Sequence, residues 1–273
     1  MRLVLFALFL LAAAAASPLK SAELPVDLEL VLAVDVSLSM DPLEQKLQRE
    51  GYVRALNSGD VIDAVTAGGT GRIALTYVEW AGRAQQRVVV PWTIVDGAAA
   101  MRAFTATIAA APVVTHPRTA LSSALLFAAT LFEANGVSGV RRVVDVSGDG
   151  PNNQGPPVAA ARDLLVAAGI VINGLPLMIE EPGFGLFDIY NLDHYYRQCV
   201  IGGPQSFIMP VFGWDGFAAA VKRKLVLEIA GDAPLPLIRV QADPRNPARP
   251  APVIDCLIGE KMWDGNLGPA DMP

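Results

Sequence analysis

The chain has 273 residues, of which 52% are hydrophobic and 18% charged, with a formal net charge of −6 and a pI near 5.0. This hydrophobic fraction excludes a wholly disordered chain, and the length allows one large domain or two small ones. The acidic balance and the lack of a dense basic cluster argue against a nucleic-acid partner. The short basic run at 222–224 falls within a helical pattern and predicts a solvated helix face.

The first residues, MRLVLFALFLLAAAAASPLKSAELP, have the pattern of an export signal, with one Arg before an apolar run and then several alanines. The apolar run from Leu3 to Ala16 is short for a membrane-spanning helix, which needs about 20 residues. We therefore predict a signal peptide over residues 1–22, with a retained anchor as the alternative. After signal removal we expect no membrane span and a periplasmic or secreted location.

The sequence contains two cysteines, Cys199 and Cys256. An exported protein meets oxidising conditions, in which these two could form one disulfide that ties the C-terminal tail to the body of the protein. Sequence alone does not show that they approach each other, so a disulfide and two free thiols both stay open.

From Val26 onward, short β-branched runs alternate with stretches of helical spacing. The predicted strands cover residues 27–37, 71–81, 87–95, 141–149, 170–179 and 205–211. The predicted helices cover residues 41–58, 96–111, 119–135, 156–169, 192–201 and 215–231. The short polar link between the second and third strands indicates a hairpin.

This alternation predicts an α/β fold: a Rossmann-like, doubly wound, mostly parallel sheet with one antiparallel edge strand and helices on both faces. We expect one domain over residues 23–231. Residues 232–273 are Pro-rich and predict an extended or partly disordered tail.

Ligands of an open α/β sheet bind beyond the carboxyl ends of its strands, so the polar residues at those ends are the candidates for a site. The first strand ends in Asp35-Val36-Ser37-Leu38-Ser39, and the strand at 141–149 ends in Ser-Gly-Asp-Gly, which includes Asp149. Thr119 lies at the start of a predicted helix, where capping is its ordinary role. We expect five side chains to converge there: Asp35, Ser37, Ser39, Thr119 and Asp149.

These side chains offer hard oxygen ligands without His or Cys, which suits a divalent cation such as Mg²⁺, with Ca²⁺ or Mn²⁺ as alternatives. A cation would also compensate the charge of Asp35, which follows an apolar run built to be buried. The simpler interpretation is that Ser37 and Ser39 only cap the helix that begins near Asp41.

The residues DVSLS, the Thr of TAL and the Asp of SGDG, in that order, resemble the metal-ion-dependent adhesion site (MIDAS) of von Willebrand factor A domains, which also occur in integrins. The resemblance covers Val26 to about Gly231. Stretches such as YVEWAG and DVSGDGPNNQG are similar to an exported bacterial branch of these domains that carries a domain-of-unknown-function label.

The resemblance implies that Ser37 and Ser39 ligate the metal directly, and that Thr119 does so when a ligand is engaged. Asp35 and Asp149 would act mainly through bound water. The open coordination position would take an acidic residue of a protein partner. Two departures from the family pattern stand near the site: Leu38 where Gly is common, and Arg118 just before Thr119.

Other polar residues have structural interpretations. Asp145 lies inside its strand, where we expect it to pair with Arg141 or Arg142, and Asp41 is expected to cap the following helix. His116 is expected to orient the loop near the site rather than to bind metal.

The sequence thus predicts a cation-dependent protein-binding or adhesion domain that is not an enzyme. One alternative is a metal-dependent phosphatase or hydrolase that uses the same carboxylates. Another is a scaffold domain whose metal site is not functional. The hydrolase motifs G-x-S-x-G and the Walker loop do not occur in the expected context.

Overall fold

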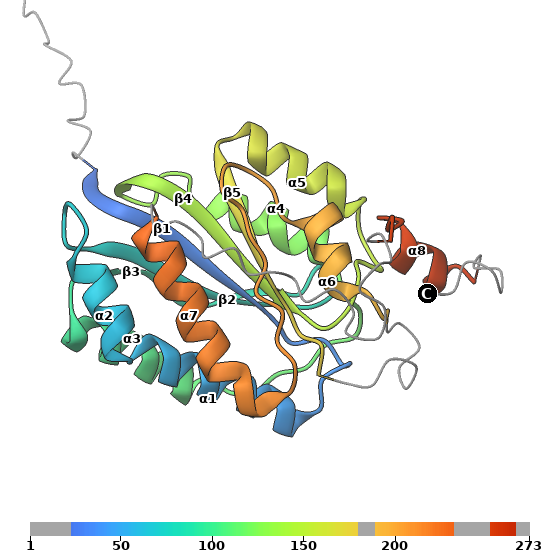
Figure 1. Ribbon diagram of the computed structural model, residues 1–273, viewed down its shortest axis with the longest axis horizontal. Helices are drawn as coiled ribbons and strands as arrows, with labels where there is room; N and C mark the ends of the chain where they lie inside the picture. The colour runs from blue at the N-terminus through green and yellow to red at the C-terminus, as the bar shows by residue number, and fades with distance from the viewer. Residues whose placement is uncertain (1–22, 180–188, 232–251, 266–273) are drawn as a thin grey trace, which may run out of the picture.

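The computed structural model describes residues 23–179, 189–231 and 252–265, and its elements are shown in Figure 1. The strands are β1 (Leu24–Asp35), β2 (Ile73–Trp80), β3 (Gln86–Val95), β4 (Val137–Gly148) and β5 (Ile170–Pro176). The helices are α1 (Pro42–Leu56), α2 (Gly59–Thr66), α3 (Ala98–Ala110), α4 (Leu121–Leu131), α5 (Val158–Ala167), α6 (Leu192–Tyr195), α7 (Phe217–Ala230) and α8 (Ile258–Trp263). A π-helical turn, Tyr196–Val200, extends α6, and a 3₁₀ turn, Trp214–Gly216, precedes α7.

The five strands form one sheet in the order β3-β2-β1-β4-β5. Neighbouring strands are parallel except for β2 and β3, which pair antiparallel through the hairpin. The predicted doubly wound sheet with one antiparallel edge strand is therefore confirmed. β1 lies at the centre of the sheet, and helices cover both faces of the sheet, which explains the nearly continuous apolar sequence of this strand.

Alternate side chains of β1 enter two separate cores. Leu30, Leu32 and Val34 pack with α1, α2, α3 and α7 on one face of the sheet. Val31 and Ala33 pack with α4, α5 and α6 on the other face. Figure 1 shows these two helical layers on opposite sides of the sheet. The period-2 geometry of a strand thus sends Asp35 to the same face as Val31 and Ala33.

One expectation for the C-terminal half was wrong. Residues 205–211 form isolated bridges to β5, such as Gly174 with Ile208, rather than a sixth strand. The described part of the predicted tail, residues 252–265, contains the helix α8 and packs on the domain. The predicted signal peptide and residues 232–251 lie outside the described residues.

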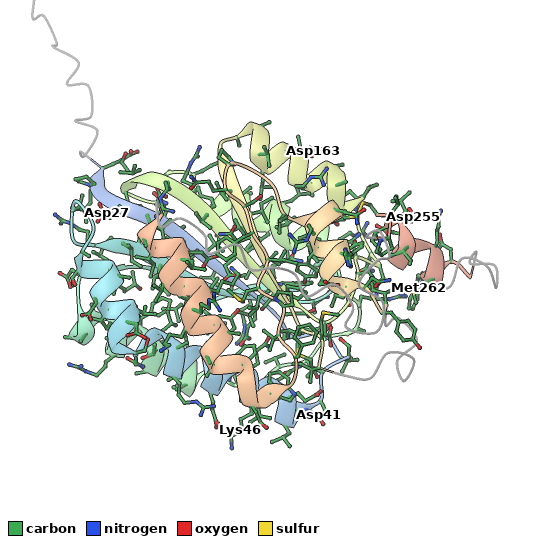
Figure 2. The ribbon with its side chains drawn as sticks, in the orientation of Figure 1. Asp27, Asp41, Lys46, Asp163, Asp255 and Met262 are labelled. Carbon is green, nitrogen blue, oxygen red and sulfur yellow. A yellow bond between two sulfur atoms is a disulfide. The ribbon has the colours of Figure 1, made fainter. Side chains whose placement is uncertain are left out.

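The described part of the chain contains no helix long and apolar enough to cross a membrane. Figure 2 shows Asp27, near the start of β1, at one end of the long axis. Asp255 and Met262, in the C-terminal segment, lie at the other end. The carboxyl end of the parallel sheet therefore faces the same end of the molecule as α8.

A buried ionic cluster joins α7 to the middle of the sheet. Lys224 is fully buried, and its Nζ lies 2.6 Å from Oδ1 of Asp145 on β4. It also donates to Glu228, which accepts from Asn173 Nδ2 at 2.9 Å. The expected solvated face at 222–224 is therefore wrong for Lys224. The expected pairing of Asp145 with a neighbouring arginine is wrong too, because Lys224 reaches it across the core.

Glu228 gives this cluster a pH dependence. Burial, and next the charge of Asp145, raise the pKa of the Glu228 carboxyl from 4.5 to about 7, against the opposing effect of Lys224. The folded state therefore holds the proton more tightly than the unfolded state. Stability from this group is present at low pH and is lost as pH rises through the folded pKa.

We predict that the free energy of unfolding falls between about pH 5 and pH 8, by up to about 3 kcal/mol from Glu228. Glu228→Gln keeps an oxygen that accepts from Lys224 and Asn173 but cannot ionise, so its stability profile should be flatter. Urea unfolding at several pH values measures this. If the free energy of unfolding changed equally with pH in the parent and the variant, the assignment of this pH dependence to Glu228 would be contradicted.

Candidate metal centre

The strand register brings two loops together at the carboxyl edge of the sheet. β1 and β4 are parallel, and Val34 pairs with Ser147. The next residues along these strands, Asp35 and Gly148, are therefore neighbours, and Asp149 follows directly. Two of the predicted site residues thus meet because of the register alone.

The carboxylate of Asp35 is fully buried, and its two oxygens have different environments. Oδ1 accepts a hydrogen bond from the backbone N–H of Ser37 at 2.7 Å. Oδ2 is buried and has no hydrogen-bond partner among the described residues. An orphaned buried carboxylate oxygen is costly, so this position favours a ligand that compensates it.

Gly148 makes room for that carboxylate. A Cβ on Gly148 would lie 2.8 Å from Asp35 Oδ2 and 2.9 Å from the hydroxyl oxygen of Tyr196. Both distances are too short for ordinary contacts, so the glycine is required by close approach rather than by its backbone angles. Tyr196 is buried and its hydroxyl also has no hydrogen-bond partner among the described residues.

A chain of hydroxyl groups leads from Asp35 to Asp149. The Oγ atoms of Ser37 and Ser39 lie 2.8 Å apart, and Ser39 Oγ donates to Asp149 Oδ1 at 2.8 Å. Ser37 is buried, Asp149 is half-buried and Ser39 is exposed. The site therefore begins at a buried carboxylate and opens to solvent at Ser39.

Thr119, the fifth predicted residue, lies beside this loop pair. Its backbone N–H donates to Asn153 Oδ1 at 2.9 Å, and its carbonyl accepts from the Asn153 N–H at 2.8 Å. Its Oγ1 lies 4.0 Å from where a Cβ on Gly150 would stand. The structure thus places Thr119 next to the residue that follows Asp149, and joins it to this loop through the backbone.

The first loop is fixed by neighbours that leave its hydroxyl groups available. The buried side chain of Gln48 on α1 donates to the carbonyl of Asp35 at 2.9 Å. The backbone of His116 accepts from Leu38 N–H and donates to Val36 O, which confirms its expected loop-orienting role. His116 acts there through its backbone rather than its imidazole.

The capping interpretation of the two serines is not supported. Asp41 is the N-cap of α1, where it accepts from Glu44 N–H, and the Glu44 side chain accepts from Asp41 N–H in return. The cap is therefore complete without Ser37 or Ser39, whose hydroxyl groups face each other and Asp149.

The electrostatics of the site favour a bound cation. Burial, and next the charge of Asp149, raise the pKa of the Asp35 carboxyl well above its usual range, against hydrogen bonds from Ser37 and from the backbone of Asp149. A divalent cation beside both carboxylates would reverse this effect. No three His, Cys, Asp or Glu side chains gather at one point within the described ranges, so a cation here would also need hydroxyl ligands. Hydroxyls, carboxylates and water together suit a hard cation.

Asn152 and Asn153, which follow Asp149 closely in sequence, hold the second loop in place. Asn153 fixes Thr119, and Asn152 Oδ1 accepts from the N–H of Ser122 in α4 at 2.9 Å. Both are buried, although they are polar and lie in a turn. In the sequence, the two asparagines directly after SGDGP could have indicated this role, whereas no sequence pattern pointed to Tyr196.

Comparisons with known proteins give a family and a fold. Residues 25–233 match the family described as "Protein of unknown function (DUF1194)", so the chain belongs to that family. No curated protein matches the sequence.

Three solved structures share the fold. The proximal thread matrix protein 1 from the mussel byssus, with a zinc-occupied MIDAS motif, has a TM-score of 0.54 and 15% identity over 76% of this chain and 47% of its own. A von Willebrand factor type A protein from Catenulispora acidiphila has a TM-score of 0.53 and 15% identity over 75% and 43%. The pilus adhesin SpaC from Lactobacillus rhamnosus GG has a TM-score of 0.56 and 10% identity over 75% and 30%.

The chain has the von Willebrand factor A fold, as the sequence resemblance implied. It matches less than half of the length of each of these three chains. At these identities the likeness shows the fold, and the chemistry of the site depends on the residues described above.

We predict that Asp35→Asn stabilises the metal-free protein, by an amount on the order of 1–3 kcal/mol. Asn removes a buried charge near Asp149 and keeps an oxygen that accepts from Ser37 N–H. Urea unfolding in the presence of a chelator measures the change. If metal-free Asp35→Asn were less stable than the metal-free parent, the ionised Asp35 carboxylate would not destabilise the fold.

Proposed function

We propose that this chain binds one divalent cation at the carboxyl edge of its sheet and uses it to hold an acidic residue of a protein partner. The buried, orphaned Oδ2 of Asp35 carries the proposal, since a cation at this edge would compensate its charge. The hydroxyl chain that leads from Ser37 through Ser39 to Asp149 supplies further oxygen ligands in reach of solvent.

Each residue has a distinct part in this proposal. Ser37 and Ser39 ligate the cation through their Oγ atoms, as the resemblance to the adhesion site implies. Asp35 and Asp149 supply negative charge and orient bound water, and Thr119 joins when a partner is engaged. The cation itself supplies a Lewis-acidic position for a carboxylate. Mg²⁺ suits this mixture of hydroxyl and water ligands, with Ca²⁺ and Mn²⁺ as alternatives.

The surroundings of the site support access by another protein. Leu38 is 60% exposed and lies between the two serines. Its apolar side chain would give a protein partner a hydrophobic contact beside the cation. The zinc-occupied MIDAS of the mussel protein and the adhesin SpaC provide precedents for metal binding and adhesion among proteins of this fold.

The disulfide supports the proposed location outside the cytoplasm. Cys199 and Cys256 are bonded, with a Cα–Cα distance of 5.4 Å, and no free cysteine remains. Disulfides persist in the periplasm and outside cells. Together with the export signal expected in residues 1–22, this favours a periplasmic or secreted protein.

The test of this function is calorimetric titration of the metal-stripped chain with Mg²⁺, Ca²⁺ and Mn²⁺. We expect one saturable site, lost in Asp35→Ala and in Asp149→Ala. At a cation concentration about 100 times the Kd, binding should stabilise the parent by about 2.7 kcal/mol. Acidic peptides should then bind the loaded protein and not the chelated one.

The matched control is Asp63→Asn, which removes an exposed carboxylate of α2 far from the site in sequence. It should bind the cation as the parent does. Retained affinity in Asp149→Ala would overturn the site, and absence of binding by the parent would overturn the function. Steady hydrolysis of a generic phosphate ester, lost in Asp35→Ala, would favour the enzyme alternative instead.

A further inference from the structure

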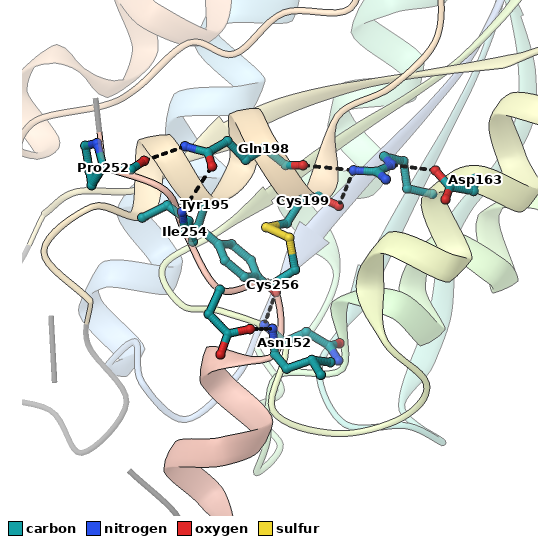
Figure 3. The surroundings of a disulfide bond; sticks show 11 residues. Asn152, Asp163, Tyr195, Gln198, Cys199, Pro252, Ile254 and Cys256 are labelled. Carbon is teal, nitrogen blue, oxygen red and sulfur yellow. Dashed lines mark hydrogen bonds and ion pairs between the residues drawn. A yellow bond between two sulfur atoms is a disulfide. The ribbon is translucent and has the colours of Figure 1, made fainter. Parts of the chain in front are cut away.

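The C-terminal segment, residues 252–265, is anchored to the domain by three kinds of contact. Figure 3 shows its disulfide between Cys256 and Cys199, which are 57 residues apart in the sequence. Just before Cys256, the Gln198 side chain donates to Pro252 O at 2.8 Å and accepts from Ile254 N–H at 3.0 Å. Ile258 of α8 is buried against the second core.

This segment reaches the loop that follows Asp149. Glu260 Oε1 accepts a hydrogen bond from Asn152 Nδ2 at 2.7 Å. Gly259 packs so closely on this loop that a Cβ would lie 2.2 Å from Asn152 O. Asn152 is fully buried and Glu260 is half-buried, and burial raises the pKa of the Glu260 carboxyl. A bulkier residue at 259 would push α8 away from the loop.

Asn152 transmits this contact to the structure around Thr119. It is fully buried, its N–H donates to the hydroxyl of Tyr195 at 3.1 Å, and its Oδ1 accepts from Ser122 N–H. Asn153, the next residue, makes two hydrogen bonds to the backbone of Thr119. The position of Thr119 therefore depends on a loop that α8 supports from outside.

The C-terminal segment makes a second contact beside Thr119, through Arg118. Arg118 directly precedes Thr119 and has φ of 78°, a left-handed conformation that residues other than glycine rarely adopt. Its guanidinium lies over the indole ring of Trp263, at the end of α8. The segment thus contacts Arg118, which directly precedes Thr119, and Asn152, whose loop is hydrogen-bonded to Thr119.

We propose that residues 252–265, held by the Cys199–Cys256 disulfide, are a positioning element for the metal site, with Asn152 and Asn153 as the positioning residues that fix Thr119. The proposal rests on the proposed cation binding. It adds that cation affinity in the partner-engaged state, in which Thr119 joins the cation, depends on a segment remote in sequence and on its disulfide. Residues that hold metal ligands in place from behind typically affect affinity by about 10–100-fold when they are lost.

The experiment compares Glu260→Ala with Glu260→Gln in the full chain. Gln keeps an oxygen that accepts from Asn152 but removes the charge, so it separates the hydrogen bond from electrostatics. One measurement is amide hydrogen exchange of Thr119 and Ser122 in metal-free protein. The other is calorimetric cation affinity in the presence of a saturating acidic peptide, the condition in which Thr119 is proposed to join the cation. Amides of α2, on the opposite face of the sheet, serve as the internal reference.

We expect Glu260→Ala to speed exchange at Thr119 and Ser122 and to weaken cation binding roughly tenfold. Glu260→Gln should restore both, and exchange in α2 should not change. The double variant Cys199→Ser/Cys256→Ser should change exchange and affinity in the same direction as Glu260→Ala.

Parent-like exchange and affinity in Glu260→Ala would overturn the proposal, whether or not the cysteine variant folds. If the parent binds no cation, the proposed function fails and the exchange measurement still decides the positioning role. If amide exchange sped up as much in α2 as at Thr119, the variant would have lost stability in general, and this too would overturn the proposal.

Discussion

The carboxylate of Asp35 is the constraint on which the surrounding structure depends. It ends the central strand, is fully buried, and has one oxygen without a partner among the described residues. Such a group costs free energy unless a charge of opposite sign joins it. Gly148 leaves space for it, and Gln48 holds the backbone carbonyl of the same residue. The fold thus retains an unfavourable group at the edge where ligands of α/β sheets bind.

The two C-terminal helices, α7 and α8, are fixed to the domain by different interactions. α7 is held by the buried cluster around Lys224, on the face of the sheet away from Asp35. α8 reaches the site itself, through Asn152 and Arg118, and a disulfide keeps it there. The proposed metal site is therefore bounded by an element that follows the domain in sequence and contributes none of the proposed ligands.

Much of the fold could be predicted from sequence, because local patterns determine it. The alternation of apolar runs and helical spacing predicted the mostly parallel sheet with helices on both faces. Asp35, Ser37, Ser39 and Asp149 could be grouped because the carboxyl ends of adjacent parallel strands meet at one edge. That argument needs only strand order, and the observed register of β1 and β4 bears it out.

The remaining features depend on contacts between distant segments, which local patterns do not encode. A lysine in a basic run looks solvated, yet Lys224 is buried because Asp145 and Glu228 lie across the core from it. Residues 205–211 have a strand composition but pair only in isolated bridges. The docking of α8 could not be read from a Pro-rich tail, since the bond that anchors it spans 57 residues.

The most direct test of the central claim is to locate a cation in crystals of the protein. Crystals soaked with Mn²⁺ would be measured for anomalous scattering, which marks the ion independently of its ligands. We expect one peak in contact with the Oγ atoms of Ser37 and Ser39, beside Asp35 and Asp149. An empty site at saturating Mn²⁺, or a peak only elsewhere, would contradict it.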